Sequence, residues 1–309
     1  MGQTIACANQ KGGVGKTTTV VNLATYLALA GDRVLVIDLD PQGNATSGFG
    51  VDRSSIDRSI YDGLLDAGRL SDLQVPTGID GVDLVPSSMS LAGADVELAP
   101  LEQRERRLAR LIDQSDGSHD YILIDSPPSL GLLTVNALTA ADSVLIPIQC
   151  EYYALEGLTQ LIATINLVRD HLNPALEIKG VVLTMFDART NLSADVAAEV
   201  RRHLESAVFD TVVPRSVRLS EAPSYGLPIA LYRPESRGAL AYKALADEFR
   251  ARVAVGARAV GPGKPVLRRD ATGGKTSAAV TATPSTVSPA SETTEATAEP
   301  GAVTHSVLA

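Results

Sequence analysis

The chain has no tryptophan, and its 309 residues include two cysteines and four histidines. Cys7 and Cys150 stand in no CxxC or Cys/His spacing, so the sequence indicates neither a zinc site nor an iron–sulfur cluster. Both lie in apolar, strand-like contexts, which favours buried, reduced thiols in a cytosolic protein. The N-terminus does not resemble a signal peptide. No apolar run reaches the roughly 18 residues that a membrane span needs, so we expect no membrane-spanning helix.

Charge and composition divide the chain into two parts. The formal net charge of −9 argues against a generally basic surface, although a local basic patch can still bind nucleic acid. Alanine, valine, leucine and isoleucine dominate residues 1–255, which we interpret as one compact domain with an aliphatic core. Residues 256–309 are rich in Ala, Thr, Ser, Pro and Glu. Because such a segment buries too little apolar surface to offset its ordering entropy, we predict a disordered tail.

The most informative stretch is residues 11–18, which read KGGVGKTT. They follow an apolar run and precede a helical pattern, the context of a phosphate-binding loop. Glycines let the backbone bring several N–H groups to phosphate oxygens, and the start of the helix favours the same anion. Lys16 is expected to neutralise the β- and γ-phosphates, and Thr17 to bind Mg²⁺. The predicted nucleotide-binding set is Lys11, Gly12, Gly13, Val14, Gly15, Lys16, Thr17 and Thr18.

This loop departs from the usual GxxxxGKT pattern. Gln10 replaces the first glycine, and a second lysine, Lys11, precedes Lys16 by five residues. Two cations in one short loop repel each other unless a highly charged ligand lies between them. The competing interpretation, a glycine-rich turn with solvated lysines, leaves the agreement of strand, turn and helix unexplained.

Alternating patterns predict the fold. Apolar runs predict strands at 3–8, 33–38, 82–85, 121–125, 143–148, 178–185 and 211–213. Helical patterns cover 16–30, 103–112, 132–140, 155–171, 192–206 and 238–255. This alternation predicts an α/β fold, a mostly parallel, doubly wound sheet of the P-loop NTPase type with helices on both faces. Ligands bind such sheets at the carboxyl ends of the strands.

Acidic residues follow two of the expected strands. Asp125 ends an apolar run, as a Walker B aspartate does, and is expected to hold Mg²⁺ directly or through water. Asp38 and Asp40 share a strand face, and Pro41 would end that strand with Asp40 at its tip. We assign Asp40 to the attacking water or to the Mg²⁺ shell, and Asp38 to a supporting role. The competing interpretation of each aspartate is a turn former or helix cap.

Together these motifs resemble the deviant Walker A ATPases and, within them, the ParA or Soj chromosome-partitioning proteins. The resemblance spans roughly residues 1–250. The matching segments are 9–19 (NQKGGVGKTTT), 38–48 (DLDPQGNATSG), 125–128 (DSPP), 189–192 (RTNL) and 213–223 (VPRSVRLSEAP).

The resemblance implies a Mg²⁺-dependent ATPase that hydrolyses ATP to ADP and phosphate. In this family two subunits sandwich two ATP molecules. Lys11 would reach the partner's nucleotide, and Gly12 would lie where the two chains approach most closely. Asp40 would support hydrolysis with Lys11 and Lys16, and Pro214 would lie near the adenine.

The resemblance also implies partners. The ATP-bound homodimer would bind DNA without sequence preference through Arg189 and Arg218, with Arg215 extending the patch, so that the protein would be cytoplasmic and nucleoid-associated. A ParB/Spo0J-type centromere-binding protein would stimulate hydrolysis. A MinD-like membrane ATPase is the main alternative, but the tail lacks the bulky apolar face of a membrane-binding helix. An iron–sulfur carrier lacks its paired cysteines here, and a metabolic ligase lacks a recognisable substrate segment.

Overall fold

The structure, a computed structural model, describes residues 2–65, 68–151 and 154–259. The last helix, expected at 238–255, runs further, from Arg237 to Ala259. The remainder of the predicted disordered tail lies outside the described residues. Within the described part, no helix is long and apolar enough to cross a membrane.

A single sheet forms the centre of the domain, with the strand order β3-β4-β2-β5-β1-β6-β7-β8. Short β3 pairs antiparallel with β4, and the other pairs are parallel. This sheet confirms the predicted mostly parallel α/β fold. The strands are β1 Gln3–Cys7, β2 Val34–Asp38, β3 Val75–Pro76, β4 Val82–Val85, β5 Tyr121–Asp125, β6 Ser143–Gln149, β7 Glu177–Phe186 and β8 Val208–Pro214.

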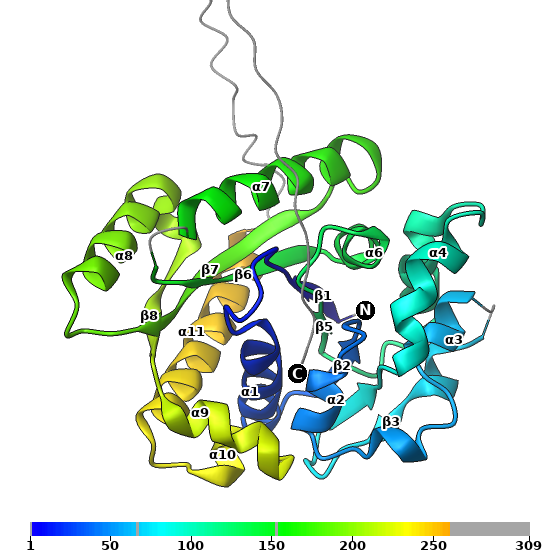
Figure 1. The fold of residues 1–309 in the computed structure, drawn as a ribbon, viewed down its shortest axis with the longest axis horizontal. Coiled ribbons are helices and arrows are strands. Elements are labelled where there is room, and N and C mark those ends of the chain that lie inside the picture. Colours follow the sequence, from blue (N-terminus) through cyan, green and yellow to red (C-terminus); the bar gives the residue numbers. More distant parts are fainter. Residues whose placement is uncertain (1, 66–67, 152–153, 260–309) are drawn as a thin grey trace, which may run out of the picture. The chain divides into compact units, whose positions relative to one another are not determined.

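Helices cover both faces of the sheet (Figure 1). One buried cluster joins one face to α1, α2 and α9–α11, and the other joins the opposite face to α3–α8. The helices are α1 Lys16–Leu29, α2 Asn44–Gly48, α3 Ile60–Leu65, α4 Ala94–Leu98, α5 Arg107–Asp113, α6 Leu132–Ala140, α7 Ala154–His171, α8 Asn191–Leu204, α9 Val217–Glu221, α10 Ile229–Tyr232 and α11 Arg237–Ala259.

Strand β2 illustrates how the sequence divides its side chains between the two layers. Val34 and Val36 belong to the cluster with α1, whereas Leu35 and Ile37 belong to the cluster on the other face. All four are fully buried. A continuous apolar run suits a strand that is covered on both faces, since successive side chains point to opposite sides.

The parallel arrangement brings the carboxyl ends of the central strands to one edge of the sheet. Asp125 at the end of β5 is the register partner of Cys7 on β1 and of Asp38 on β2. The loop after β1 and two of the predicted acidic residues therefore lie side by side, where open α/β sheets bind ligands.

Candidate nucleotide-binding site

The loop between β1 and α1 has the backbone of a phosphate cradle. Gly13 and Gly15 have φ angles of +72° and +90°, which residues with a Cβ rarely adopt. Gly15 is the N-cap of α1, and the amide of Thr19 donates to its carbonyl at 2.9 Å. The loop therefore presents backbone N–H groups at the positive end of the helix, where an anion is stabilised.

Hydrogen bonds to strands β6 and β7 hold this loop. The side-chain Nδ2 of Asn9 donates to the Pro147 carbonyl at 2.7 Å. Its Oδ1 accepts from the backbone amide of Lys11 at 3.0 Å. The Thr184 hydroxyl donates to the Val14 carbonyl at 2.8 Å. Neither Asn9 nor Thr184 was among the predicted site residues. Asn9 belongs to the first matching segment, whereas no local signal marks Thr184 within its apolar strand.

Lys16 lies inside the site. It is 6% exposed, and its ammonium donates to the Lys11 carbonyl at 3.4 Å. Burial lowers the pKa of Lys16, while the nearby Asp125 raises it. The side chain is thus held at the loop with a long hydrogen bond that a phosphate oxygen can replace.

Asp125 is fully buried beside Lys16. Neither carboxylate oxygen makes a well-formed hydrogen bond to a described residue, although the Thr17 hydroxyl is close enough to stabilise its charge. Burial raises the pKa of Asp125 well above its ordinary value, and Asp38 raises it further. A buried carboxylate without hydrogen bonds is unfavourable unless a cation compensates it. Asp125 and Thr17 therefore supply oxygen ligands that fit Mg²⁺.

Asp38 and Asp40 have different roles in the next loop. Asp38 accepts from the amide and the hydroxyl of Thr46, each at 2.7 Å, and burial raises its pKa. Asp40 lies beyond the end of β2, which stops at Asp38, two residues before the predicted tip. Its backbone carbonyl accepts from the Ser87 hydroxyl at 2.7 Å, and its side chain lines the cavity. Asp38 thus supports the loop that carries Asp40.

A cavity of about 470 Å³ opens beside the loop. Of the predicted nucleotide- and metal-binding residues, four are not among its lining: Lys11, Val14, Asp125 and Pro214. A second cavity of about 300 Å³ is lined by Pro214 and shares Gly15 and Thr18 with the first. The polar and loop residues that line the first cavity are Gly12, Gly13, Gly15, Lys16, Thr17, Thr18, Asn22, Asp40, Gln42 and Asn44.

Gly12 lines the first cavity, whereas Lys11 lines neither cavity. The Lys11 ammonium pairs with Glu151 at 3.2 Å, and the two side chains are 36% and 46% exposed. Gly12 is exposed, and a Cβ built on it would have Pro128 as its nearest contact, at 3.8 Å. Nothing within the described chain therefore crowds this glycine.

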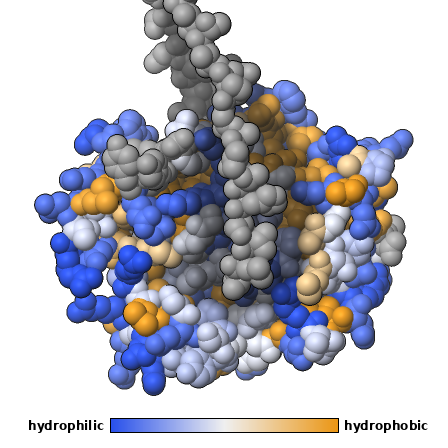
Figure 2. Space-filling view, in the orientation of Figure 1, coloured by the Kyte–Doolittle hydropathy of each residue, from blue (hydrophilic) through white to orange (hydrophobic). Residues whose placement is uncertain are grey.

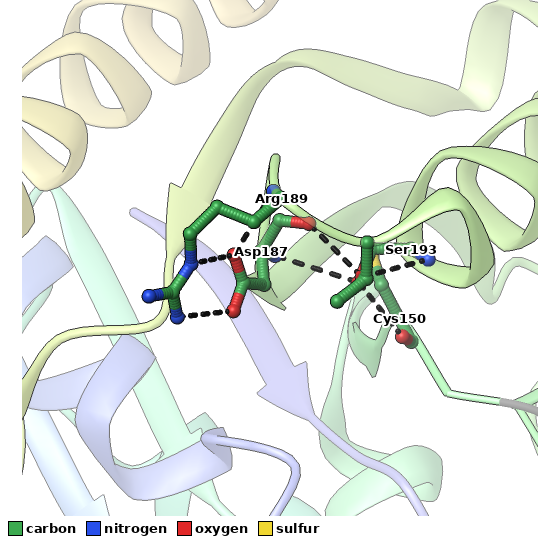
Figure 3. A network of polar contacts seen from close by, with 5 residues as sticks. Cys150, Asp187, Arg189 and Ser193 are labelled. Atoms are coloured by element: carbon green, nitrogen blue, oxygen red, sulfur yellow. Dashed lines mark hydrogen bonds and ion pairs between the residues drawn. The ribbon is translucent and has the colours of Figure 1, made fainter.

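The predicted DNA-binding arginines lie on exposed loops and helix α9. None of them lines the first cavity, but Arg215 lines the second. Arg189 forms a two-pronged pair with Asp187, with distances of 2.8 and 2.7 Å (Figure 3). The amide of Arg215 donates to the Phe186 carbonyl at 3.0 Å, next to Asp187. Arg218 pairs with Glu221 at 2.7 Å on α9.

A glycine-rich loop at the carboxyl end of a parallel sheet, with a buried lysine beside a buried carboxylate, defines a P-loop nucleoside triphosphatase. No group of three or more His, Cys, Asp or Glu side chains in the described residues is arranged to hold a metal by itself. Magnesium in this class is bound together with the nucleotide phosphates, which agrees with that result.

Comparisons with known proteins place the chain within this class. A family model described as an AAA domain matches residues 2–178. The sporulation initiation inhibitor protein Soj of Bacillus subtilis (strain 168) is 56% identical over 251 residues, 81% of this chain and 99% of Soj. The chromosome partitioning protein ParA of Myxococcus xanthus (strain DK1622) is 52% identical over 249 residues, 81% of this chain and 88% of that protein. The chain belongs to the Soj/ParA family of chromosome-partitioning ATPases, as its motifs predicted.

Solved structures share the fold and carry the expected ligands. One is cobyrinic acid a,c-diamide synthase from Mycobacterium smegmatis with bound ADP and magnesium. It is 38% identical with a TM-score of 0.73, over 83% of this chain and 97% of that chain. Another is the septum site-determining protein MinD from Pyrococcus horikoshii with Mg-ADP. It is 26% identical with a TM-score of 0.69, over 82% of this chain and 98% of that chain. Both support the prediction of ATP and Mg²⁺ as cofactors.

Proposed function

We propose that this chain is an ATP-dependent DNA-partitioning switch. With ATP and Mg²⁺ bound, two copies form a sandwich homodimer that binds DNA without sequence preference. Hydrolysis to ADP and phosphate releases the DNA, and a ParB/Spo0J-type partner stimulates it. The protein then works in the cytoplasm at the nucleoid, with no membrane step. The 56% identity to Soj over most of both chains supports this function.

The cavity supports the ATPase step. The Lys16 ammonium, next to the Lys11 carbonyl, would bind the β- and γ-phosphates in place of that contact. Thr17, Asp125 and Asp40 would hold Mg²⁺, which neutralises phosphate charge when bound. Asp40 stands on the cavity wall and would orient the attacking water.

The position of Lys11 carries the proposal of a sandwich dimer. Its side chain is not among the lining of the cavity that contains Lys16, and its ammonium pairs with Glu151 outside it. A second loop lysine that does not serve its own nucleotide is available for the partner's. Breaking a half-exposed ion pair costs only about 0–1 kcal/mol, so the transfer to a triphosphate is favourable.

The arginine surface supports DNA binding. Arg189, Arg215 and Arg218 are all exposed. They lie near the ends of β7 and β8 and on α9, at the left of Figure 1, and this part of the face is mainly hydrophilic in Figure 2. Exposed guanidinium groups contact phosphates without reading base sequence, which suits non-specific binding.

The test is retention on DNA with ATP for wild type, Gly12→Val and Arg189→Glu. A Cβ on Gly12 would meet only Pro128, at 3.8 Å, and the φ of Gly12 is ordinary. Its valine variant should therefore fold and bind ATP as a single chain, yet lose ATP-dependent dimers and DNA retention. Arg189→Glu should keep the dimer and lose DNA retention. Sedimentation with ATP and ADP measures the dimer, and a DNA pull-down measures retention.

A matched control is Arg104→Glu, which reverses an exposed, ion-paired arginine just before α5. It should retain DNA as wild type does. Equal, nucleotide-independent retention by Gly12→Val, Arg189→Glu and wild type would contradict the switch. Pelleting with liposomes in ATP separates the MinD-like alternative, which predicts nucleotide-dependent membrane binding.

A further inference from the structure

Two of the three arginines of the proposed DNA surface, Arg189 and Arg218, are paired with carboxylates. Asp187 faces Arg189 with both carboxylate oxygens: Oδ1 accepts from Nε at 2.8 Å, and Oδ2 accepts from Nη2 at 2.7 Å (Figure 3). Oδ1 also accepts from the backbone amide of Arg189 at 3.0 Å. Such two-pronged pairing is the geometry in which a guanidinium binds a phosphate, so Asp187 occupies the edge that a phosphate would use.

The start of α8 fixes Asp187 in place. Its carbonyl accepts from the Thr190 hydroxyl at 3.1 Å, and its amide donates to the Ser193 hydroxyl at 3.4 Å (Figure 3). Thr190 is in turn the N-cap of α8. The Asp187 side chain is 21% exposed, against 87% for Arg189. The backbone of Asp187 is therefore held by the start of α8, and its carboxylate is much less exposed than the guanidinium that it pairs with.

A second carboxylate, that of Glu221, pairs with Arg218 through one guanidinium nitrogen. Glu221 accepts from Nη1 of Arg218 at 2.7 Å and from the Tyr232 hydroxyl at 3.2 Å. Arg189 with Arg215 holds the pKa of Asp187 well below its usual range, and Arg218 lowers the pKa of Glu221. Both carboxylates are thus negatively charged near neutral pH.

We propose that Asp187 and Glu221 are built-in counter-charges that limit the affinity of the arginine surface for the DNA backbone. This inference rests on the proposed function, because it concerns the same surface. Each acid competes with a phosphate for its arginine and repels the phosphate that replaces it. A switch that must leave DNA after hydrolysis gains from such weakening, since tightly held phosphates would keep the dimer bound.

The test compares DNA binding by the full-length ATP-bound protein across a salt series for wild type, Asp187→Asn and Glu221→Gln. Asparagine keeps an oxygen that can accept from the Arg189 amide, so the loop geometry is preserved while the charge is lost. Binding of Asp187→Asn should tighten about tenfold at low salt. The slope of log K against log salt concentration should become more negative by about two, because one more phosphate is neutralised by each subunit of the dimer. Glu221→Gln should also tighten binding and steepen the salt dependence, but to a smaller extent. Glu221 pairs with one nitrogen of the Arg218 guanidinium, whereas Asp187 pairs with two nitrogens of Arg189.

The matched control is Glu105→Gln, which removes a carboxylate from an exposed arginine pair just before α5. It should leave affinity and slope as in wild type. Weaker binding or an unchanged slope for Asp187→Asn would overturn the proposal and leave Asp187 as a residue that only positions Arg189. Thermal unfolding of each variant verifies that it is folded. The variant Arg189→Ala distinguishes failure of this proposal from failure of the proposed DNA-binding function. If Arg189→Ala binds DNA as wild type does, the proposed DNA surface itself is wrong.

Discussion

At the nucleotide site Lys16 and Asp125 are buried close to each other, and the carboxylate has no well-formed hydrogen bond in the described chain. Arg189 and Arg218, on the outer surface, are exposed, and each has its own carboxylate. The buried charges of the first region can bind a ligand such as a phosphate or a metal ion. In the second region each arginine is already paired with a carboxylate of the same chain.

The difference predicts how each region responds to salt. Buried charges are screened little, whereas exposed charges are screened over about 8 Å at physiological ionic strength. Nucleotide binding should therefore be tight and only weakly dependent on salt. DNA binding should be weak, adjustable and strongly dependent on salt. A nucleotide-controlled switch needs both properties.

The largest expected effect comes from Lys16→Ala. Because the ammonium is buried at the loop, its loss removes charged hydrogen bonds to phosphate that nothing nearby replaces. ATP affinity should fall by about 100-fold, the equivalent of about 3 kcal/mol. Titration with a fluorescent ATP analogue at low and high salt measures this, and the loss should be similar at both.

Lys243→Ala is the control for that loss, since it removes an exposed lysine that pairs with Asp247 on α11. It should bind ATP as wild type does. A loss for Lys16→Ala that disappears at high salt would contradict the contrast between the two regions, because it would place Lys16 among the screened charges.

The next effect concerns pH and stability. The pKa of Asp125 is raised by burial, so the folded state binds this proton more tightly than the unfolded state does. The stability supplied by the proton is therefore lost as pH rises from the ordinary value of about 3.9 through the raised one. An asparagine side chain cannot ionise, so Asp125→Asn should stabilise the nucleotide-free protein relative to wild type by about 2 kcal/mol near pH 8 and by little near pH 4.

Denaturant unfolding without nucleotide at both pH values measures this difference. Asp125→Asn should also lose the extra stabilisation that Mg²⁺ gives in the presence of ATP, so stability and function change in opposite directions. Asp83→Asn, which removes a half-exposed carboxylate paired with His119, is the comparison variant. An equal stability difference at both pH values would mean that Asp125 does not titrate in this range.

Much of the fold followed from local pattern. Continuous apolar runs such as Tyr121–Asp125 identify strands covered on both faces, and six of the seven predicted strands agree with the structure to within two residues at each end. The errors lie where local pattern is weak. Strand β8 starts at Val208, three residues before the prediction, because its partly exposed stretch interrupts the apolar run. The short helices α2, α3, α4, α9 and α10 were missed, since four to six residues carry no clear helical period.

The site was predictable to the extent that it is local. The loop glycines, Lys16 and Asp125 each carry a sequence signal, and the structure brings them together. Thr184 and Ser87 hold the site from distant strands and loops, and a single hydroxyl in an apolar context gives no warning of its partner. Asp187 was not among the predicted residues, and only the geometry shows that its carboxylate accepts from Nε and Nη2 of Arg189.

The smallest expected effect tests an ion pair that lies between the two regions. Lys11 and Glu151 are each about half exposed, so their pair is worth only about 0–1 kcal/mol. Glu151→Gln frees Lys11 for the partner's nucleotide and should lower the ATP concentration needed for half-maximal dimers by about twofold to fivefold. Sedimentation across an ATP series measures it. In a Lys11→Ala background the same change should have no effect, because the double-mutant cycle removes the shared contact. Weaker dimers for Glu151→Gln alone would instead make Glu151 part of the interface, with Lys11 already in position before the second chain arrives.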